Sequence, residues 1–295
     1  MNAKHAGLVP LLVVLASLLV FILSFYPEQN LSPNLIFNLP APFSSAYAFL
    51  LSISALVVAF FFARGFLSSG SLYLITLGSG SLILGLGFLL SQILGSAPFG
   101  GPNQLTGISS LVFLASGVFY SASVTLSLVG KTVRLEKSAL ALLVGYAGSI
   151  ALVIVAIVSV EMKFTPDFFV SGVGPTLLRQ QVLGAAIVLF AYASVVLMRN
   201  YTVSEVSILY WFSLGLAAIA VGFLSAFLGK VPGGPFSWLG RISLIVGGIY
   251  FVVSISQSYK GSEAKMSQET RPNADLQLVA LSGIASQRDS KAPFL

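Results

Sequence analysis

Long apolar stretches alternate with short polar connections along most of this chain. We count eight such stretches, at approximately residues 7–26, 45–63, 72–94, 107–129, 138–160, 181–198, 208–228 and 240–257. An α-helix needs about 20 mostly apolar residues to cross the hydrocarbon core of a bilayer. The pattern therefore predicts an all-α fold, a polytopic transmembrane bundle of about eight spans. The sixth and eighth stretches are the shortest, and the count falls to seven if either fails to cross the membrane.

The composition agrees with a chain that lies in lipid. Of the 295 residues, 56% are hydrophobic and only 8% are charged, whereas soluble domains usually carry about 25% charged residues. A soluble fold of this size could not bury that apolar excess, but a bilayer solvates it. We therefore expect the lipid bilayer as a partner. We attribute the net charge of +6 to basic loops on one side of the membrane and not to nucleic-acid binding.

Lysine and arginine residues are unevenly divided between the two sides of the membrane. Eleven of the fifteen lie in the connections on the side of the N-terminus, and four lie on the other side: Lys163, Arg179, Lys230 and Arg241. Basic loops favour the cytoplasmic side. We therefore predict a multi-pass protein of the cell membrane with both termini in the cytoplasm, and we call the side of the four basic residues the outer side.

A polar segment follows the last apolar stretch. Residues 258–295 are rich in Ser, Gln, Lys and Glu, and Gly261 and Pro272 would interrupt a helix there. We predict a transmembrane domain over residues 1–257 and a largely disordered cytoplasmic tail over residues 258–295. A short apolar run at 275–284 is expected either to contact a partner or the membrane, or to be a partly helical end without a role.

Candidate chemistry is scarce in this sequence. There is no cysteine, and the one histidine, His5, lies near the N-terminus, so a haem, zinc or di-iron site within the membrane lacks ligands. The ionisable residues Arg64, Glu161, Arg199 and Arg241 lie at the ends of the apolar stretches, where long side chains reach the interface. Pumps and ion-coupled transporters place such groups at mid-membrane depth. We predict no enzyme, no catalytic residue, no cofactor and no metal site.

The outer connection between the fifth and sixth stretches has the most distinctive sequence. Its glycines allow positive φ, and its prolines stiffen the chain on either side. We predict that Phe164, Phe168 and Phe169 fold this loop over the bundle as a lid, or that they anchor a plain connection at the interface. We also predict an ion pair between Asp167 and Arg179 across the loop, the alternative being that each charge faces water.

This loop resembles the signature loop of the membrane-associated sensor (MASE) family, in its type-three branch. That loop has an aromatic-Pro-Asp start, a Gly-x-Gly centre, a threonine and then a basic residue that enters the next helix. The matching candidate residues here are Pro166, Asp167, Gly172, Gly174 and Thr176, with Arg179 in place of the usual lysine. The resemblance covers roughly residues 5–257, but only this loop is specific.

Several positions depart from the family pattern. Pro175 precedes the threonine, whereas the proline of the family follows it. Leu183 takes the place of a glutamate early in the next helix, and Ser91 or Gln92 takes the place of a histidine late in the third helix. If those groups read the signal of the family, this chain senses a different signal or none.

The resemblance implies a membrane sensor module. Members of the family usually feed a histidine kinase or a diguanylate cyclase, and the residues after 257 are too few for either domain. We therefore predict a sensor-like input module without its own catalytic output, which signals through a separate signalling protein or a homo-oligomer. The alternatives are a facilitator-type small-molecule transporter and a structural subunit of a membrane complex. The sequence names no ligand.

Overall fold

The structure is a computed structural model, and it describes residues 3–25, 41–95, 101–128, 138–170, 173–204, 207–229 and 233–257. The chain divides into two compact units, Met1–Ser254 and Ile255–Leu295, and the helix packing lies within the first. The predicted tail, residues 258–295, lies outside the described residues.

The described residues contain eight helices that are long and apolar enough to cross a membrane. Seven of them are α1 (Ala3–Phe25), α2 (Ala41–Ser69), α3 (Leu72–Gly95), α4 (Pro102–Leu128), α5 (Ser138–Glu161), α6 (Leu177–Ser204) and α7 (Ser207–Leu228). The eighth is Pro235–Gln257, which we call the last helix. Two short strands, β1 (Phe169–Val170) and β2 (Gly174–Pro175), stand between α5 and α6. The prediction of an all-α polytopic bundle with eight spans is confirmed.

The two spans that the sequence pattern made shortest are longer in the structure. Helix α6 begins at Leu177, ahead of the predicted residue 181, and the last helix begins at Pro235, ahead of residue 240. The predicted start of α6 left out Arg179, because a charge at membrane depth is costly. Helix α6 instead includes Arg179, whereas Arg241 already lay inside the predicted span 240–257. Both helices are long enough to cross a membrane, so the alternative of seven spans is not needed.

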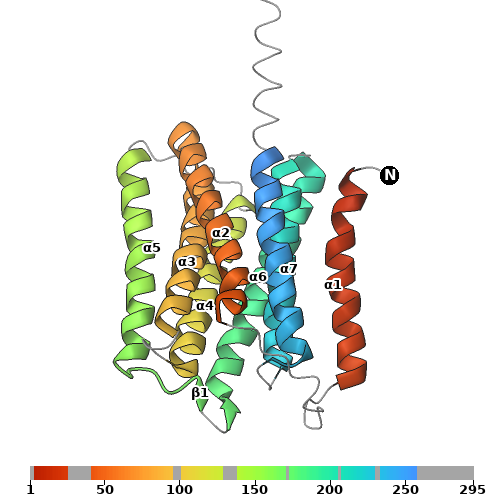
Figure 1. Ribbon diagram of the computed structural model, residues 1–295. Helices are drawn as coiled ribbons and strands as arrows, with labels where there is room; N and C mark the ends of the chain where they lie inside the picture. The colour runs from red at the N-terminus through yellow and green to blue at the C-terminus, as the bar shows by residue number, and fades with distance from the viewer. Residues whose placement is uncertain are drawn as a thin grey trace, which may run out of the picture. The chain divides into compact units, whose positions relative to one another are not determined.

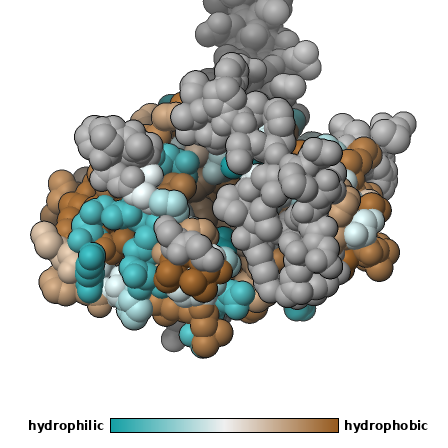
Figure 2. Space-filling view, turned by 60° about the horizontal axis from the view of Figure 1, so that its bottom comes forward, coloured by the Kyte–Doolittle hydropathy of each residue, from teal (hydrophilic) through white to brown (hydrophobic). Residues whose placement is uncertain are grey.

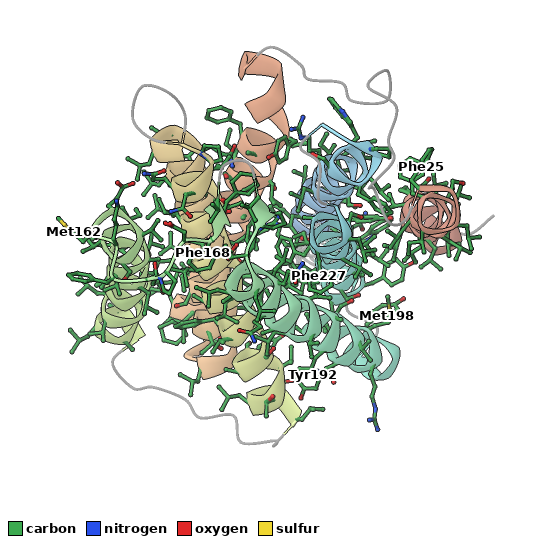
Figure 3. The ribbon with its side chains drawn as sticks, turned by 90° about the horizontal axis from the view of Figure 1, so that it is seen from below. Phe25, Met162, Phe168, Tyr192, Met198 and Phe227 are labelled. Atoms are coloured by element: carbon green, nitrogen blue, oxygen red, sulfur yellow. The ribbon has the colours of Figure 1, made fainter. Side chains whose placement is uncertain are left out.

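The helices differ in how much of their surface faces other helices. In the most apolar window of α3 and of α7, 67% of the residues are buried, against 17% in α1 and in α5. Two views agree that α5 and α1 lie at opposite edges of the set of helices (Figures 1 and 3). Helix α3 packs on α2 and α4, and α6 packs on α4 and α7. Lipid would solvate the apolar faces that α1 and α5 leave exposed.

Aromatic rings fill the middle of the bundle. Tyr120 of α4 meets Phe190 of α6 and Phe212 of α7 edge to face, with ring centroids 5.4 and 5.8 Å apart. The Tyr120 hydroxyl lies 3.0 Å from the Ser81 hydroxyl of α3. A tyrosine buried in this way needs a partner for its hydroxyl, and Ser81 provides it. The cluster joins α3, α4, α6 and α7.

Apart from tyrosines, the buried polar side chains of the described residues are all serines. Most of their hydroxyls donate to a backbone carbonyl one turn earlier, as Ser225 does to Val221 at 2.9 Å, which satisfies them without any other helix. Three buried polar side-chain atoms have no hydrogen-bond partner among the described residues: Ser52 Oγ, Arg241 Nη1 and Ser243 Oγ.

The strands mark one end of the bundle, which we call the hairpin end. It lies at the bottom of Figure 1, where α4, α6 and the last helix begin and where α3, α5 and α7 finish. When this end is turned toward the viewer, hydrophilic surface gathers on it and hydrophobic surface flanks it (Figure 2). The hairpin end corresponds to the predicted outer side, and we call the other end the opposite end.

At the opposite end, Tyr250 of the last helix attaches to α1. Its hydroxyl donates to the Gly7 carbonyl at 2.6 Å and accepts from the Leu11 N–H at 3.1 Å. In an unbroken helix these two backbone groups would pair with each other. Pro10 lies beside them inside α1, and a proline ring disturbs the preceding turn. Tyr250 therefore ties the last helix to the backbone of α1 in the turn next to Pro10.

Candidate functional site

Helix α5 ends in a turn that sends the chain toward α6. The Phe164 N–H donates to the Ser159 carbonyl at 2.9 Å, and the Lys163 N–H donates to the Val160 carbonyl at 3.2 Å. This is the hydrogen-bond pattern of a Schellman motif, which places the residue after the helix in the left-handed region. Lys163 has φ 56°. Glycine is the usual residue at this position, so Lys163 holds a backbone conformation that costs a side-chain-bearing residue free energy.

The hairpin itself is short and antiparallel. Phe169 pairs with Pro175, and Val170 pairs with Gly174. The turn between the strands includes a bond of 3.1 Å from the Val173 N–H to the Val170 carbonyl. Gly174 adopts φ 104°, which explains why a glycine stands there. The other glycine of the predicted signature, Gly172, lies outside the described residues.

Asn103 of α4 holds the start of the hairpin. Its side-chain amide donates from Nδ2 to Asp167 Oδ1 at 2.7 Å. Its Oδ1 accepts from the backbone N–H groups of Phe168 at 2.7 Å and Phe169 at 3.1 Å. One side chain therefore makes three hydrogen bonds to three successive residues of the loop. A single substitution at Asn103 would leave two N–H groups and one carboxylate oxygen without this partner.

The first turn of α4 explains how Asn103 reaches the loop. Pro102 is the first residue of α4, where its missing N–H is not needed. The Gln104 side chain accepts from the Gly101 N–H at 3.0 Å, as in a capping box. With the helix end fixed in this way, Asn103 lies beside the hairpin. Our sequence analysis missed Asn103, and the signal that could have found it is a polar residue next to Pro102 at a helix start.

Phe168 is the only one of the three predicted lid phenylalanines that is buried. It is 1% exposed, whereas Phe164 is 77% exposed. A Cβ built on Gly107 of α4 would stand 3.2 Å from the Phe168 ring and 3.1 Å from Val160. Gly107 therefore leaves the space that Phe168 fills. Figure 3 places Phe168 among the helix ends and Met162 at the edge. The prediction that all three rings fold over the bundle is wrong, because the Phe164 side chain is exposed.

Thr176 joins the hairpin to α6. Its hydroxyl donates to the Asp167 carbonyl at 2.9 Å, and its N–H donates to the Phe168 carbonyl at 3.1 Å. The same hydroxyl accepts from the Arg179 N–H at 3.4 Å, and the Thr176 carbonyl accepts the first helical bond, from Gln180. Thr176 is therefore the N-cap of α6.

Arg179 lies in the first turn of α6, and its side chain bonds to the end of α7 and not to the loop. Its Nη2 donates to the Ala226 carbonyl at 3.2 Å. The last carbonyls of a helix lack partners within the helix and carry its partial negative charge, so a cation is stabilised there. The predicted ion pair between Asp167 and Arg179 is wrong: Asp167 accepts from Asn103, and Arg179 donates to α7.

We call Asn103, Asp167, Thr176 and Arg179 the hairpin latch. Through these four residues the loop is bonded to the starts of α4 and α6, and α6 is bonded in turn to the end of α7. Pro166 is exposed beside Asp167, where its ring restricts the backbone that enters the latch. The groups of the latch satisfy one another and place no nucleophile next to a base, so the arrangement acts as a structural joint between helix ends.

The residues of the family resemblance have separate roles in this geometry. Asp167 and Thr176 hold the loop, Gly174 turns it, and Arg179 caps a neighbouring helix. These are roles in fixing the loop, and they do not by themselves identify a family. Comparison of the chain with models of known families, with characterised proteins and with solved structures finds no match in any of the three.

Proposed function

We propose that this membrane-embedded chain is a sensor-like module of the membrane-associated sensor type, which receives its signal at the hairpin end and passes it to a partner. The observation that carries this proposal is the hairpin latch. Because the loop is bonded to the starts of α4 and α6, and Arg179 of α6 is bonded to the end of α7, an event that displaces the loop acts on two helix ends directly and on α7 through α6. A plain connection between α5 and α6 would need no such bonds.

Packing at the opposite end supports a route through the membrane. Arg179 contacts the end of α7, and at the start of α7 the Trp211 ring packs against Gly7 of α1. Tyr250 of the last helix is bonded to the same turn of α1. A shift of α7 would therefore displace the ring of Trp211 against α1. Coupling between the two ends is measured by the distance between labels at the opposite end.

The partner would act on the side of the opposite end. We propose that this side is cytoplasmic, from the uneven distribution of lysine and arginine. Fusions of a reporter that is active only in the cytoplasm, placed at Met1 and at Leu295, should both be active. An active fusion at one terminus and an inactive fusion at the other would contradict this orientation.

The test of the proposed function asks whether the latch controls the opposite end. The chain has no cysteine, so cysteines introduced at Ser68 in α2 and Leu128 in α4, both exposed at the opposite end, carry spin labels specifically. We expect Asn103→Ala to change the distance distribution between the two labels. The matched control is Val173→Ala, which alters an 82% exposed residue of the same hairpin outside the latch and should leave the distribution unchanged.

Two results would count against a sensor. Identical distributions for Asn103→Ala and the unsubstituted chain would show that the latch is not coupled to the opposite end. Rapid uptake of small neutral solutes by proteoliposomes, unaffected by Asn103→Ala, would favour the facilitator-type transporter.

A further inference from the structure

Arg241 lies near the start of the last helix, at the hairpin end, between two aromatic rings. Its guanidinium carbon is 4.9 Å from the centre of the Trp238 ring and 5.6 Å from the centre of the Tyr47 ring of α2. Its Nη1 is buried and has no hydrogen-bond partner among the described residues. Two aromatic rings thus hold the Arg241 cation in place. Its Nη1 donor has no acceptor in the described part of the chain.

An arginine in this state is costly at a membrane boundary. A guanidinium has five N–H donors and always carries its charge, and burial of an unpaired charged group is unfavourable. The two aromatic faces attract the cation by about 0.5–2 kcal/mol, but they accept no conventional hydrogen bond. A buried donor without an acceptor calls for an explanation, and an anionic ligand would supply both the charge and the acceptor.

The described part of the chain offers no carboxylate for this role. Its acidic residues are Glu161 and Asp167. Asp167 accepts from Asn103 in the hairpin latch, and Glu161 is exposed at the end of α5. Glu28 lies on the same predicted side of the membrane but outside the described residues, so a test must separate Glu28 from an external anion.

We propose that Arg241, flanked by Tyr47 and Trp238, binds a phosphate group at the hairpin end. Guanidinium groups bind phosphate oxygens through paired N–H donors. The two rings restrict the side chain before binding, which lowers the entropy lost when the ligand arrives. Trp238 and Arg241 lie within the first two turns of the last helix, near the depth at which aromatic residues meet lipid headgroups. The phosphate comes either from a phospholipid headgroup of that leaflet or from solution.

The proposed site is separate from the hairpin latch. None of its three residues belongs to the latch. The proposed phosphate site therefore goes beyond the proposed sensor function, and a test of one does not decide the other. The two unpartnered serines are not part of the site as we define it. Ser243 turns its Cβ toward Gly222 of α7, where a Cβ built on the glycine would lie 3.2 Å away. Ser243 therefore packs against α7, whereas Arg241 packs against Tyr47 of α2.

The chain has two tryptophans, which makes the site measurable. In a Trp211→Phe background the emission comes from Trp238 alone, next to the guanidinium of Arg241. One arm titrates inorganic phosphate into the full chain in detergent and follows this emission. The other arm identifies phospholipids that remain bound to the full chain by native mass spectrometry. The variants are Arg241→Gln, Arg241→Lys and Glu28→Gln, and the matched control is Arg64→Gln, which removes an exposed arginine at the opposite end.

We expect the unsubstituted site to respond in at least one arm. Saturable quenching by phosphate identifies a dissolved anion, and a retained phospholipid identifies a headgroup. Arg241→Gln should weaken binding at least about tenfold, Arg241→Lys should weaken it less, and Arg64→Gln should leave it unchanged.

Three results would overturn the site. The first is no response in either arm, which is informative even if Arg241→Gln fails to fold. The second is equal binding by Arg241→Gln and the unsubstituted chain. The third is a response that emerges only in Glu28→Gln, which would show that Arg241 is paired within the chain.

Discussion

Two arginines near the hairpin end, Arg179 and Arg241, show how differently one bundle can hold the same side chain. Arg179 donates to the Ala226 carbonyl at the end of α7. Arg241 lies between Trp238 and Tyr47, with Nη1 unpartnered among the described residues. Arg241 was expected to reach the interface from the end of its helix, whereas Arg179 was expected to pair with Asp167. The structure instead gives one arginine a fixed backbone partner and leaves the other with a donor to spare.

The difference separates a structural role from a binding role. Arg179 bonds a helix end within the chain and so contributes to the stability of the bundle. Removal of Arg241 would eliminate an uncompensated charge, which costs little or even stabilises a protein. The hairpin end therefore combines a satisfied region, centred on the latch, with an unsatisfied one, centred on Arg241. A substitution in one of these regions should leave the other intact.

The largest expected loss of stability comes from removing the buried apolar side chain beside the hairpin latch. Phe168→Ala removes a ring that is 1% exposed, and substitutions of this kind cost about 3–5 kcal/mol. Thermal unfolding in detergent should shift to clearly lower temperature. Phe164→Ala is the control in the same loop, at a residue 77% exposed, and should change stability by less than about 0.5 kcal/mol. Equal effects of the two substitutions would mean that Phe168 does not anchor the hairpin.

A smaller effect is expected at the start of α6. Thr176→Ala removes the N-cap hydroxyl and its bond to the Asp167 carbonyl, and loss of an N-cap costs about 1 kcal/mol. Thr176→Ser keeps the hydroxyl and should retain most of the stability. Protease digestion of the hairpin should accelerate for the alanine variant only. A serine variant as sensitive as the alanine variant would contradict the capping role.

The smallest effect is a gain in stability. Lys163 occupies the left-handed region with φ 56° at the end of α5. Lys163→Gly removes the crowding of Cβ, which costs about 1–2 kcal/mol in that region, but it also loosens the unfolded chain. We expect a net stabilisation of less than about 1 kcal/mol, seen as a slightly higher unfolding temperature. Lys163→Val, with a branched Cβ, should lower it, and a stabilising valine would refute the assigned backbone.

The eight spans followed from hydropathy because each helix carries enough apolar side chains to be recognised alone. The start of α6 did not follow, because a hydropathy pattern treats Arg179 as a break and cannot know that the end of α7 will supply a partner. Asn103 was missed for a similar reason. Its bonds join residues 64 to 66 positions apart, and no local pattern reports a contact at that separation. The predicted Asp167–Arg179 pair failed because opposite charge near in sequence does not exclude better partners on other helices.

The most direct measurement compares Arg179→Gln with Arg241→Gln in one thermal unfolding experiment, each without ligand, with inorganic phosphate and with a short-chain phosphatidylglycerol. Arg179→Gln should unfold at a lower temperature without ligand, since the Ala226 carbonyl loses a charged donor worth about 1.5–3 kcal/mol. It should still be stabilised by a phosphate-bearing ligand. Arg241→Gln should unfold without ligand near the temperature of the unsubstituted chain and lose the stabilisation by ligand. If the two substitutions lower stability equally, or if Arg241→Gln is stabilised by either ligand as much as the unsubstituted chain, the division between a structural and a ligand-binding arginine is wrong.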